Sequence, residues 1–182
     1  MTTPPRPLRK DQLRNRRLLL DAARAAFTEE GPDLAIDAIA RRAGVSPSTF
    51  YRHFPTKDAL VDRLLDELTD GARQVAARAA DIPDPWEAFR TVFTHGCVLE
   101  DTELRLFDIL CRTSPHSARH GHRATTDLIA PAADRARAAG RLRPDVSVED
   151  IAAFMRMADS ATSLEQRRRA QDVLLTGMLH SD

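Results

Sequence analysis

The sequence has few of the features that mark secreted, membrane-spanning or disulfide-rich proteins. Two cysteines among 182 residues, Cys97 and Cys111, are too few for a disulfide scaffold. No apolar run approaches the roughly 18 residues that a membrane span needs, and the N-terminus lacks the apolar run of a secretory signal. We therefore expect a cytoplasmic protein with no membrane partner, in which both cysteines serve as small core residues rather than redox sensors.

The motifs of common catalytic sites are missing as well. The sequence contains no Ser/His/Asp or Cys/His arrangement, no HExxH motif and no phosphate-binding loop. We predict that the chain is not an enzyme and carries no cofactor. A helical enzyme remains an alternative from another functional class.

Three closely spaced histidines, His116, His120 and His122, raise the question of a metal site. The spacing of His116 and His120 suits two ligands on one helix face only if one helix includes both, and beside Pro115 and Gly121 the predicted helix runs from about Ala118 to Ala139. No carboxylate or cysteine falls at ligand spacing beside them. We therefore predict no metal site.

The net charge is zero, with 27 basic and 27 acidic residues, but the charges are unevenly distributed. Residues 1–64 hold 12 Lys or Arg and 8 Asp or Glu, a balance of +4, which leaves −4 for the remainder. Most of the basic excess lies before residue 18, in Arg6, Arg9, Lys10, Arg14, Arg16 and Arg17. Such a segment attracts phosphates within a Debye length even on a neutral protein. We predict a basic arm that approaches nucleic acid; for its first residues a solvated tail is the alternative.

Hydrophobic periodicity predicts a chain made of helices, and strand signals are almost absent. In the first helix, apolar residues fall at i, i+3, i+4, i+7 and i+8, as Leu19, Ala22, Ala23, Ala26 and Phe27. Glycine and proline mark breaks at Gly31-Pro32, Gly44, Ile82-Pro83, Ser114-Pro115 and Gly140. Capping signals mark later helix starts at Asp84, Ser147–Asp150 and Ser163–Gln166. The segments between these marks give nine helices and an all-α fold.

Residues 36–57, IDAIARRAGVSPSTFYRHFPTK, predict two short helices joined by a tight turn. The first runs from about Ile36 to Ala43 and stops at Gly44. The second opens at Ser46-Pro47, because serine can cap a helix and proline suits its first position, and it ends at Phe54-Pro55. Two short helices around a glycine-containing turn are the elements of a helix-turn-helix. We therefore predict that the second helix enters a DNA groove.

The second of these helices presents short polar side chains that allow close approach to base edges. The residues expected on its outer face are Pro47, Ser48, Thr49, Arg52 and His53. Tyr51, His53 and Lys57 lie where hydroxyl, imidazole and ammonium donors can hold phosphates. We assign Phe54 to the core and Arg41-Arg42 to a solvated helix face.

The string AGVSPSTFYRHFPTKDAL resembles the signature of the tetracycline-repressor (TetR) family of bacterial one-component regulators. The family pattern is an Ile-Ala pair, Ala-Gly-Val-Ser, a short recognition helix, Tyr-x-His-Phe, and a lysine that starts the next helix. The matching residues here are Ile39-Ala40, Ala43–Ser46, Pro47–His53, Tyr51/His53/Phe54 and Lys57. The resemblance is close over about residues 15–68. Elsewhere the resemblance is limited to helix count and length and to short sequence segments such as Leu142–Asp145 and Leu174–Leu179.

The resemblance implies an all-α, nine-helix fold with an N-terminal three-helix helix-turn-helix domain and a helical body that binds a ligand and dimerises. The expected division is a flexible basic arm at residues 1–14, the helix-turn-helix domain at 15–60, and the body at 61–182. It also implies a homodimer paired through its last two helices. Such a dimer would place two recognition helices on a pseudo-palindromic operator in double-stranded DNA.

By position, the resemblance implies that Ser48 and Thr49 reach bases and that Pro47 packs on a thymine methyl group. It gives Tyr51, His53 and Lys57 the role of phosphate ligands. The whole predicted DNA-binding set is Arg16, Ser46, Pro47, Ser48, Thr49, Tyr51, Arg52, His53 and Lys57. One position departs from the family, which often has a phosphate-binding threonine before the second helix where this chain has Ala35. Arg14, Arg16 and Arg17 are candidates to replace that contact.

The body is expected to hold an unknown small-molecule effector. Apolar residues that are candidates to line its pocket are Trp86, Phe89, Phe93, Phe107, Cys111, Phe154 and Met155. For each of them, filling the core is the alternative. The function that we predict is a sequence-specific transcriptional regulator, a repressor that the effector releases from DNA. The alternatives are a helical ligand-binding module with weak or vestigial DNA binding, and a helical enzyme.

Overall fold

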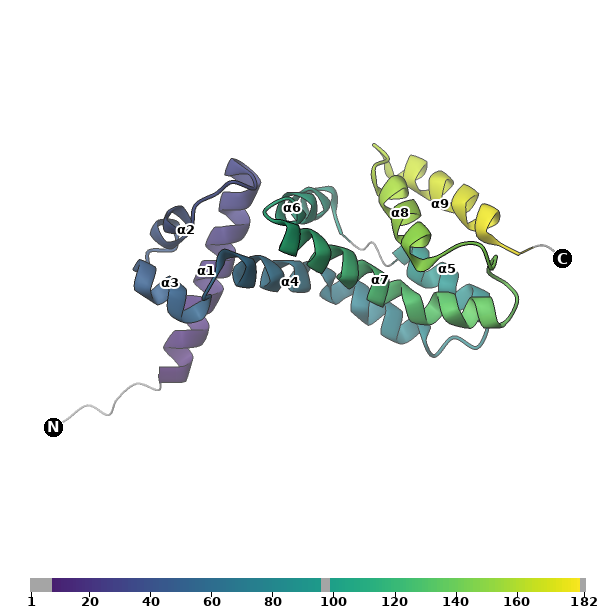
Figure 1. The fold of residues 1–182 in the computed structure, drawn as a ribbon, viewed down its shortest axis with the longest axis horizontal. Coiled ribbons are helices and arrows are strands. Elements are labelled where there is room, and N and C mark those ends of the chain that lie inside the picture. Colours follow the sequence, from purple (N-terminus) through teal and green to yellow (C-terminus); the bar gives the residue numbers. More distant parts are fainter. Residues whose placement is uncertain (1–7, 96–98, 181–182) are drawn as a thin grey trace. The chain divides into compact units, whose positions relative to one another are not determined.

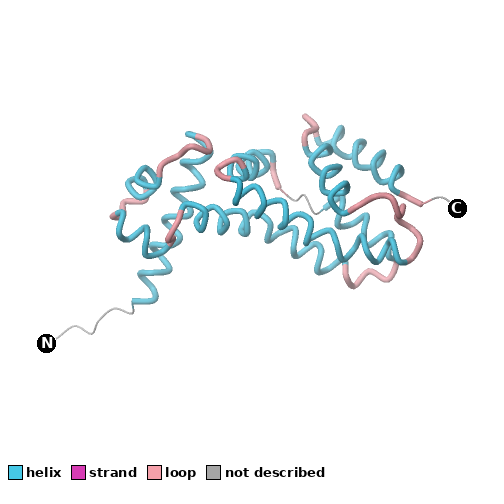
Figure 2. Tube along the Cα trace, viewed as in Figure 1, coloured by secondary structure: helices cyan, strands magenta, loops and turns pink. Residues whose placement is uncertain are grey.

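The computed structural model describes residues 8–95 and 99–180, and over these residues the chain folds into nine α-helices (Figure 1). Their bounds are α1 Leu8–Glu30, α2 Ile36–Arg42, α3 Pro47–His53, α4 Lys57–Ala79, α5 Pro85–His95, α6 Asp101–Cys111, α7 Pro115–Ala138, α8 Val148–Asp159 and α9 Leu164–Met178. Figure 2 shows these helices joined by loops, with no strand in the described part. The prediction of an all-α, nine-helix fold is confirmed. None of the described helices is long and apolar enough to span a membrane.

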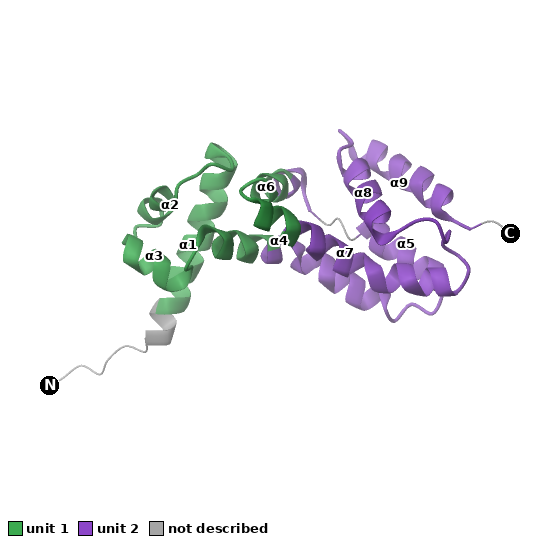
Figure 3. Ribbon diagram, in the orientation of Figure 1, with its two compact units in different colours: residues 1–65, 105–120 green, residues 66–104, 121–182 purple. Residues whose placement is uncertain are grey.

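The chain forms two compact units, coloured separately in Figure 3. Unit 1 comprises residues 1–65 and 105–120, and unit 2 comprises residues 66–104 and 121–182. This division differs from the predicted boundary at residue 60, because α4, α6 and α7 each contribute to both units. The predicted arm at residues 1–14 also differs, since α1 already begins at Leu8.

The core of unit 1 forms around the apolar stripe of α1, whose five predicted residues are buried. α2 packs against α1 and α3, and contributes the buried Ile39 and Ala40. α3 contributes Phe50, which is fully buried. Gly31 ends α1 with φ +86°, a conformation that favours glycine. The short helices of unit 1 therefore depend on tertiary packing, since a seven-residue helix is marginal alone.

The core of unit 2 joins α5, the later part of α7, and α8 and α9. Its large members include Phe89, Phe93, Ile129, Ile151, Met155 and Met178. α9 packs against both α5 and α8. An isolated antiparallel bridge between Leu142 and Leu179 closes the loop after α7 onto the end of α9.

The predicted helix caps of unit 2 are present with one exception. Asp84 accepts hydrogen bonds from the N–H groups of Trp86 and Glu87 at 2.8 and 2.9 Å, which lowers the pKa of its carboxyl. Ser147 and Asp150 form the predicted reciprocal capping box. The capping box predicted at the start of α9 is only half formed. Ser163 caps the helix, but the Gln166 side chain accepts hydrogen bonds from the N–H and hydroxyl of Thr162 instead of the N–H of Ser163.

The start of α7 differs from the sequence prediction. The sequence predicts a helix from about Ala118 to Ala139, whereas α7 begins three residues earlier, at Pro115, and continues to Ala138. Proline is tolerated at the first position of a helix, and the Ser114 hydroxyl accepts from the N–H of Ser117 at 3.1 Å. A single glycine inside a helix costs only about 1 kcal/mol. His116 and His120 therefore lie one turn apart on the same helix.

Candidate nucleic-acid interface

The turn between α2 and α3 sets the direction of the second helix. The chain leaves α2 through Ala43, and Gly44 adopts φ +66°. The N–H of Val45 then donates to the carbonyl of Ala40 at 3.0 Å, which closes the turn. Because L side chains rarely adopt this φ, glycine at position 44 fixes the geometry of the helix-turn-helix.

The first turn of α3 is built around the side chain of Ser46. Its hydroxyl accepts from the N–H of Thr49 at 3.2 Å, the N-cap bond that the sequence predicted. The same oxygen donates to Thr49 Oγ1 at 3.0 Å and lies 2.9 Å from Ser48 Oγ. Pro47 and Ser48 are exposed, and Thr49 is half-buried. The helix therefore starts with a cluster of hydroxyl groups at the protein surface.

The aromatic residues of α3 divide between core and surface. Phe50 and Phe54 are buried, with ring centroids 6.0 Å apart. Tyr51 is 48% exposed, and its ring meets that of Phe50 edge to face at 5.6 Å. The assignment of Phe54 to the core is confirmed. The phosphate-binding role of Tyr51 stays a prediction, and its exposure leaves the phenol free to take it.

Arg16 and His53 lie beside this aromatic cluster. The Arg16 guanidinium lies 4.8 Å from the ring centroid of Phe54, a cation–π contact that holds a positive charge near α3. His53 is half-buried, and its Nε2 is buried without a hydrogen-bond partner among the described residues. Burial lowers the pKa of His53, and the charges of Arg52 and Arg16 lower it further. In the free protein this imidazole is therefore biased towards its neutral form.

Lys57, the first residue of α4, has a contact that the sequence did not predict. Its ammonium donates to the carbonyl of Pro32 at 2.8 Å and lies 5.6 Å from the ring centroid of Phe27. Burial lowers the pKa of Lys57, while Asp33 and Asp58 raise it. The side chain thus fastens α4 to the loop after α1. An ammonium has three donors, so a phosphate contact remains compatible with this bond.

The outer faces of α1 and α2 are joined by an ion pair. Arg42, predicted to be solvated, makes two hydrogen bonds of 2.6 Å to the carboxylate of Glu29. This hydrogen bonding raises the pKa of Arg42 and lowers that of Glu29. Ala35 occupies the N-cap of α2 and offers no side-chain bond. Position 35 therefore has no hydroxyl that could contact a phosphate.

Together these residues form a surface with a defined chemistry. Short hydroxyl side chains open α3, and exposed or half-buried basic groups flank it, namely Arg16, Arg52, His53 and Lys57. Hydroxyl and methyl groups match base edges in a major groove, and basic groups match the phosphates on either side. The fold and this surface define the chain as a helical protein with an N-terminal helix-turn-helix.

Comparisons with known proteins show what the N-terminal segment is similar to. The model described as "Bacterial regulatory proteins, tetR family" matches residues 19–64. The transcriptional regulator EthR of Mycobacterium tuberculosis is 34% identical over 71 residues. These residues cover 38% of this chain and only 33% of EthR. The transcriptional activator FasR of Mycolicibacterium smegmatis is 29% identical over 151 residues, covering 65% of this chain and 69% of FasR.

A solved structure extends the likeness along the chain. SmeT, the repressor of the Stenotrophomonas maltophilia multidrug efflux pump SmeDEF, is 25% identical, with a TM-score of 0.67 over 91% of both chains. Residues 19–64 therefore match the tetR family of bacterial regulatory proteins, and the chain as a whole is similar in fold to SmeT.

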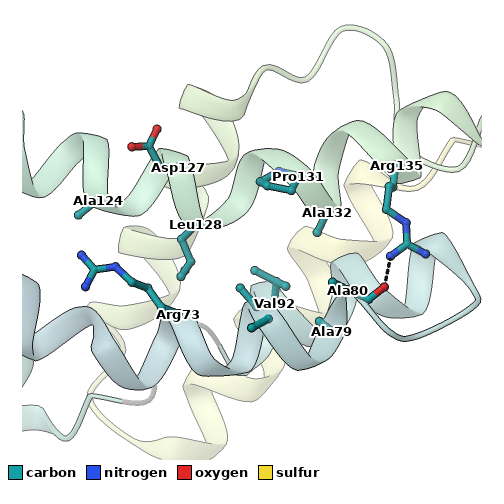
Figure 4. A pocket seen from close by; sticks show the side chains of 12 residues that line it. Arg73, Ala79, Ala80, Val92, Ala124, Asp127, Leu128, Pro131, Ala132 and Arg135 are labelled. Atoms are coloured by element: carbon teal, nitrogen blue, oxygen red, sulfur yellow. Dashed lines mark hydrogen bonds between the residues drawn. The ribbon is translucent and has the colours of Figure 1, made fainter.

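Unit 2 contains a pocket of about 430 Å³ between α4, α5 and α7 (Figure 4). Half of its lining residues are alanines with small side chains. The lining residues are Arg73, Ala76, Ala77, Ala79, Ala80, Val92, Ala124, Asp127, Leu128, Pro131, Ala132 and Arg135. The Arg135 guanidinium donates to the carbonyls of Ala80 and Ile82, both at 2.9 Å. Pro131 has no N–H to donate to the carbonyl of Asp127, four residues earlier in α7. The pocket is thus mainly apolar with a few polar groups on its walls.

The seven apolar residues proposed from the sequence are absent from the lining of this pocket. Phe89, Phe93 and Met155 are buried in the core of unit 2, and Trp86 and Phe154 pack against that core. Phe154 also lines a smaller pocket of about 350 Å³ beside α9. Phe107 and Cys111, on the part of α6 that belongs to unit 1, are half-buried. Large side chains fill the core, and the space is left where alanines face one another. Cys97 lies outside the described residues.

Proposed function

We propose that this chain is a sequence-specific transcriptional repressor that binds a pseudo-palindromic operator as a homodimer and is released by a small-molecule effector. The observation that carries this proposal is the surface of α3, where a capped first turn exposes Pro47 and Ser48 between basic groups. SmeT, which matches 91% of the chain, is a repressor, and this supports repression over the activation that FasR performs.

In this proposal Ser48 and Thr49 contact base edges and Pro47 packs on a thymine methyl group. Tyr51, His53 and Lys57 hold phosphates, with Arg16 and Arg52 as further cationic partners. Ser46 has a supporting role, because its hydroxyl already caps α3. The half-buried Thr49 shares a hydrogen bond with that cap, so DNA contact requires its hydroxyl to exchange partners.

The test is a titration of the full chain against a panel of palindromic duplexes at two salt concentrations. A repressor is expected to bind one sequence tightly, with a log affinity that falls with log salt by about 0.9 per phosphate contacted. Thr49→Ala should lose about 1–3 kcal/mol of discrimination at one base pair, whereas the exposed control Arg41→Ala should keep the wild-type specificity. Equally weak binding of every duplex would favour a helical ligand-binding module with vestigial DNA binding.

We place the dimer contact on α8 and α9 because both helices leave large apolar side chains in solvent. Met157 is 62% exposed, Leu164 70% and Val173 71%. Val173→Glu should therefore convert the dimer to a monomer, as measured by sedimentation, and weaken operator binding. Gln74→Glu adds a charge at an exposed position of α4 and should leave the dimer intact. A dimer that survives substitution of all three apolar residues would exclude this interface.

The pocket in unit 2 is the proposed effector site. Its apolar walls suit a small, mainly apolar molecule, with the Arg73 side chain and Asp127 as polar partners. SmeT has also been solved in complex with triclosan, so a protein of this fold binds a small molecule. Ala124→Phe should fill the pocket and abolish release from DNA by any effector found in a screen, while Ala138→Phe, at an exposed position of α7, should not. An unchanged effector response in Ala124→Phe would rule out this pocket.

A further inference from the structure

Three side chains with metal-binding atoms come together in unit 1, and none of them belongs to the two sites described above. Asp62 on α4 meets His116 and His120 on the first turns of α7, and their ligand atoms all lie within 4.8 Å of one another. Asp62 Oδ2 lies 2.8 Å from His116 Nε2, and Asp62 Oδ1 lies 3.6 Å from His120 Nδ1. The two imidazole rings are stacked, with centroids 6.4 Å apart and planes inclined by 26°.

The backbone beneath this cluster is held in place by a second set of contacts. Asp58, one helical turn before Asp62, accepts hydrogen bonds from the hydroxyls of Ser114 and Ser117 at 2.7 and 3.4 Å. Ser117 is fully buried, and the Ser114 hydroxyl caps α7 through the N–H of Ser117. The start of α7 is thereby fixed against α4 one turn away from the cluster. The three ligand side chains are therefore brought together before any ion binds.

One carboxylate oxygen of the cluster lacks a hydrogen-bond donor. Asp62 Oδ1 is buried and accepts no hydrogen bond from any described residue. A buried carboxylate oxygen without a donor is costly, and a cation beside it would satisfy it. The histidines keep the site open to solvent, because the side chain of His116 is 43% exposed and that of His120 is 24% exposed.

The donor set indicates the class of ion. Two imidazole nitrogens and one carboxylate oxygen suit Zn²⁺ and related divalent transition metals rather than Ca²⁺ or Mg²⁺, which prefer oxygen ligands. Zinc–ligand bonds of about 2.0–2.1 Å place tetrahedral ligands roughly 3.3 Å apart. The separations of 2.8 and 3.6 Å bracket that value. Small side-chain rotations can close the widest separation within the cluster.

We propose that Asp62, His116 and His120 bind a divalent transition metal ion such as Zn²⁺, with one or more coordination positions left to solvent. This replaces the expectation of no metal site. That expectation rested on the lack of a carboxylate near the histidines in the sequence, whereas Asp62 lies 54 residues before His116. The ion would link α4 to α7 within unit 1. The site is independent of the proposed DNA-binding function, since it uses none of the residues assigned to DNA.

The test is a zinc titration of the full, tag-free chain after removal of metals by a chelator. Calorimetry should show one ion per chain, and a parallel Co²⁺ titration should show the absorption bands of a tetrahedral or five-coordinate ion. Mutation of a residue that only hydrogen-bonds to a metal ligand typically weakens metal affinity by about 10- to 100-fold. We therefore expect Asp62→Asn, His116→Gln and His120→Gln each to weaken zinc binding by more than tenfold. Zinc should also raise the melting temperature of the wild type and not that of the variants.

The matched control is His122→Gln, which removes an exposed histidine from the same helix. It should bind zinc as the wild type does. Melting of the metal-free proteins checks that each variant is folded, and His116→Gln changes the most exposed ligand if Asp62→Asn proves unstable. The proposal is overturned if the wild type binds no zinc. Equal zinc affinity in the wild type and the three ligand variants would overturn it too, because the binding would then lie elsewhere.

Discussion

The helix-turn-helix segment and the pocket of unit 2 encode their chemistry in different ways. In residues 46–57 the candidate DNA ligands are neighbours in the sequence, and the short helix α3 determines which of them face outwards. The pocket is lined by residues of α4, α5, α7 and the residue after α4, and half of these residues are alanines. A site carried by one short helix is visible as a motif. A site formed where small residues from several helices meet has no such mark in the sequence.

The largest expected effect compares the two cores. Phe50→Ala in α3 and Phe93→Ala in α5 both remove a fully buried ring, and each should lower the free energy of unfolding by about 3–5 kcal/mol. Urea denaturation followed by circular dichroism measures both losses. At a temperature where both variants are folded, Phe50→Ala should bind the operator poorly and Phe93→Ala should retain its sequence preference. If both variants lose operator binding equally, the core of unit 2 and the DNA-binding surface of α3 are energetically coupled.

Lys57 tests whether a residue can serve both packing and DNA binding. Lys57→Ala removes the bond to the Pro32 carbonyl and should cost about 1 kcal/mol of stability. If the ammonium also holds a phosphate, operator affinity should fall by about 1.5–3 kcal/mol. The slope of log affinity against log salt should then flatten by about one.

Lys57→Gln separates the two roles, because its amide can still donate to the carbonyl but carries no charge. It should recover stability without recovering the salt slope. A wild-type salt slope in both variants would assign Lys57 to packing alone.

Local signals explain why so much of the fold was predictable. The positive φ of Gly31 and Gly44 and the cap at Ser46 each depend on a few adjacent residues. What could not be predicted depends on contacts between distant segments. The bond from Lys57 to the loop after α1 spans 25 residues, and nothing near His116 in the sequence indicates its carboxylate partner on α4.

A smaller effect is expected at position 35, where this chain departs from the tetR family pattern. Ala35 leaves the N-terminus of α2 without a side-chain cap. Ala35→Thr should add a hydrogen bond to the first turn and raise the free energy of unfolding by about 0.5–2 kcal/mol. If the family's threonine also contacts a phosphate, operator affinity should rise and the salt slope should steepen by about one. Ala35→Val matches the shape of threonine without its hydroxyl, so an equal gain in that control would contradict the cap.

The smallest expected effect concerns the pH dependence of His53. In the free protein the pKa of His53 is below its ordinary value because of burial and, secondarily, Arg52 and Arg16. Stability from the neutral imidazole is therefore fully present above about pH 6.5 and is lost as the pH falls through the lowered pKa. Acidification should thus destabilise the wild type slightly more than His53→Gln, as measured by melting at pH 8 and pH 6.

Operator binding should respond to pH with the opposite sign. A phosphate beside His53 would raise its pKa in the complex, so binding would take up a proton and affinity would increase as the pH falls towards 6. The gain is about tenfold for each unit by which the bound pKa exceeds the free one. The other five histidines are present in both proteins, so the difference between wild type and His53→Gln isolates His53. If acidification changes operator affinity equally in both, His53 does not bind a phosphate, and its buried nitrogen is a feature of packing alone.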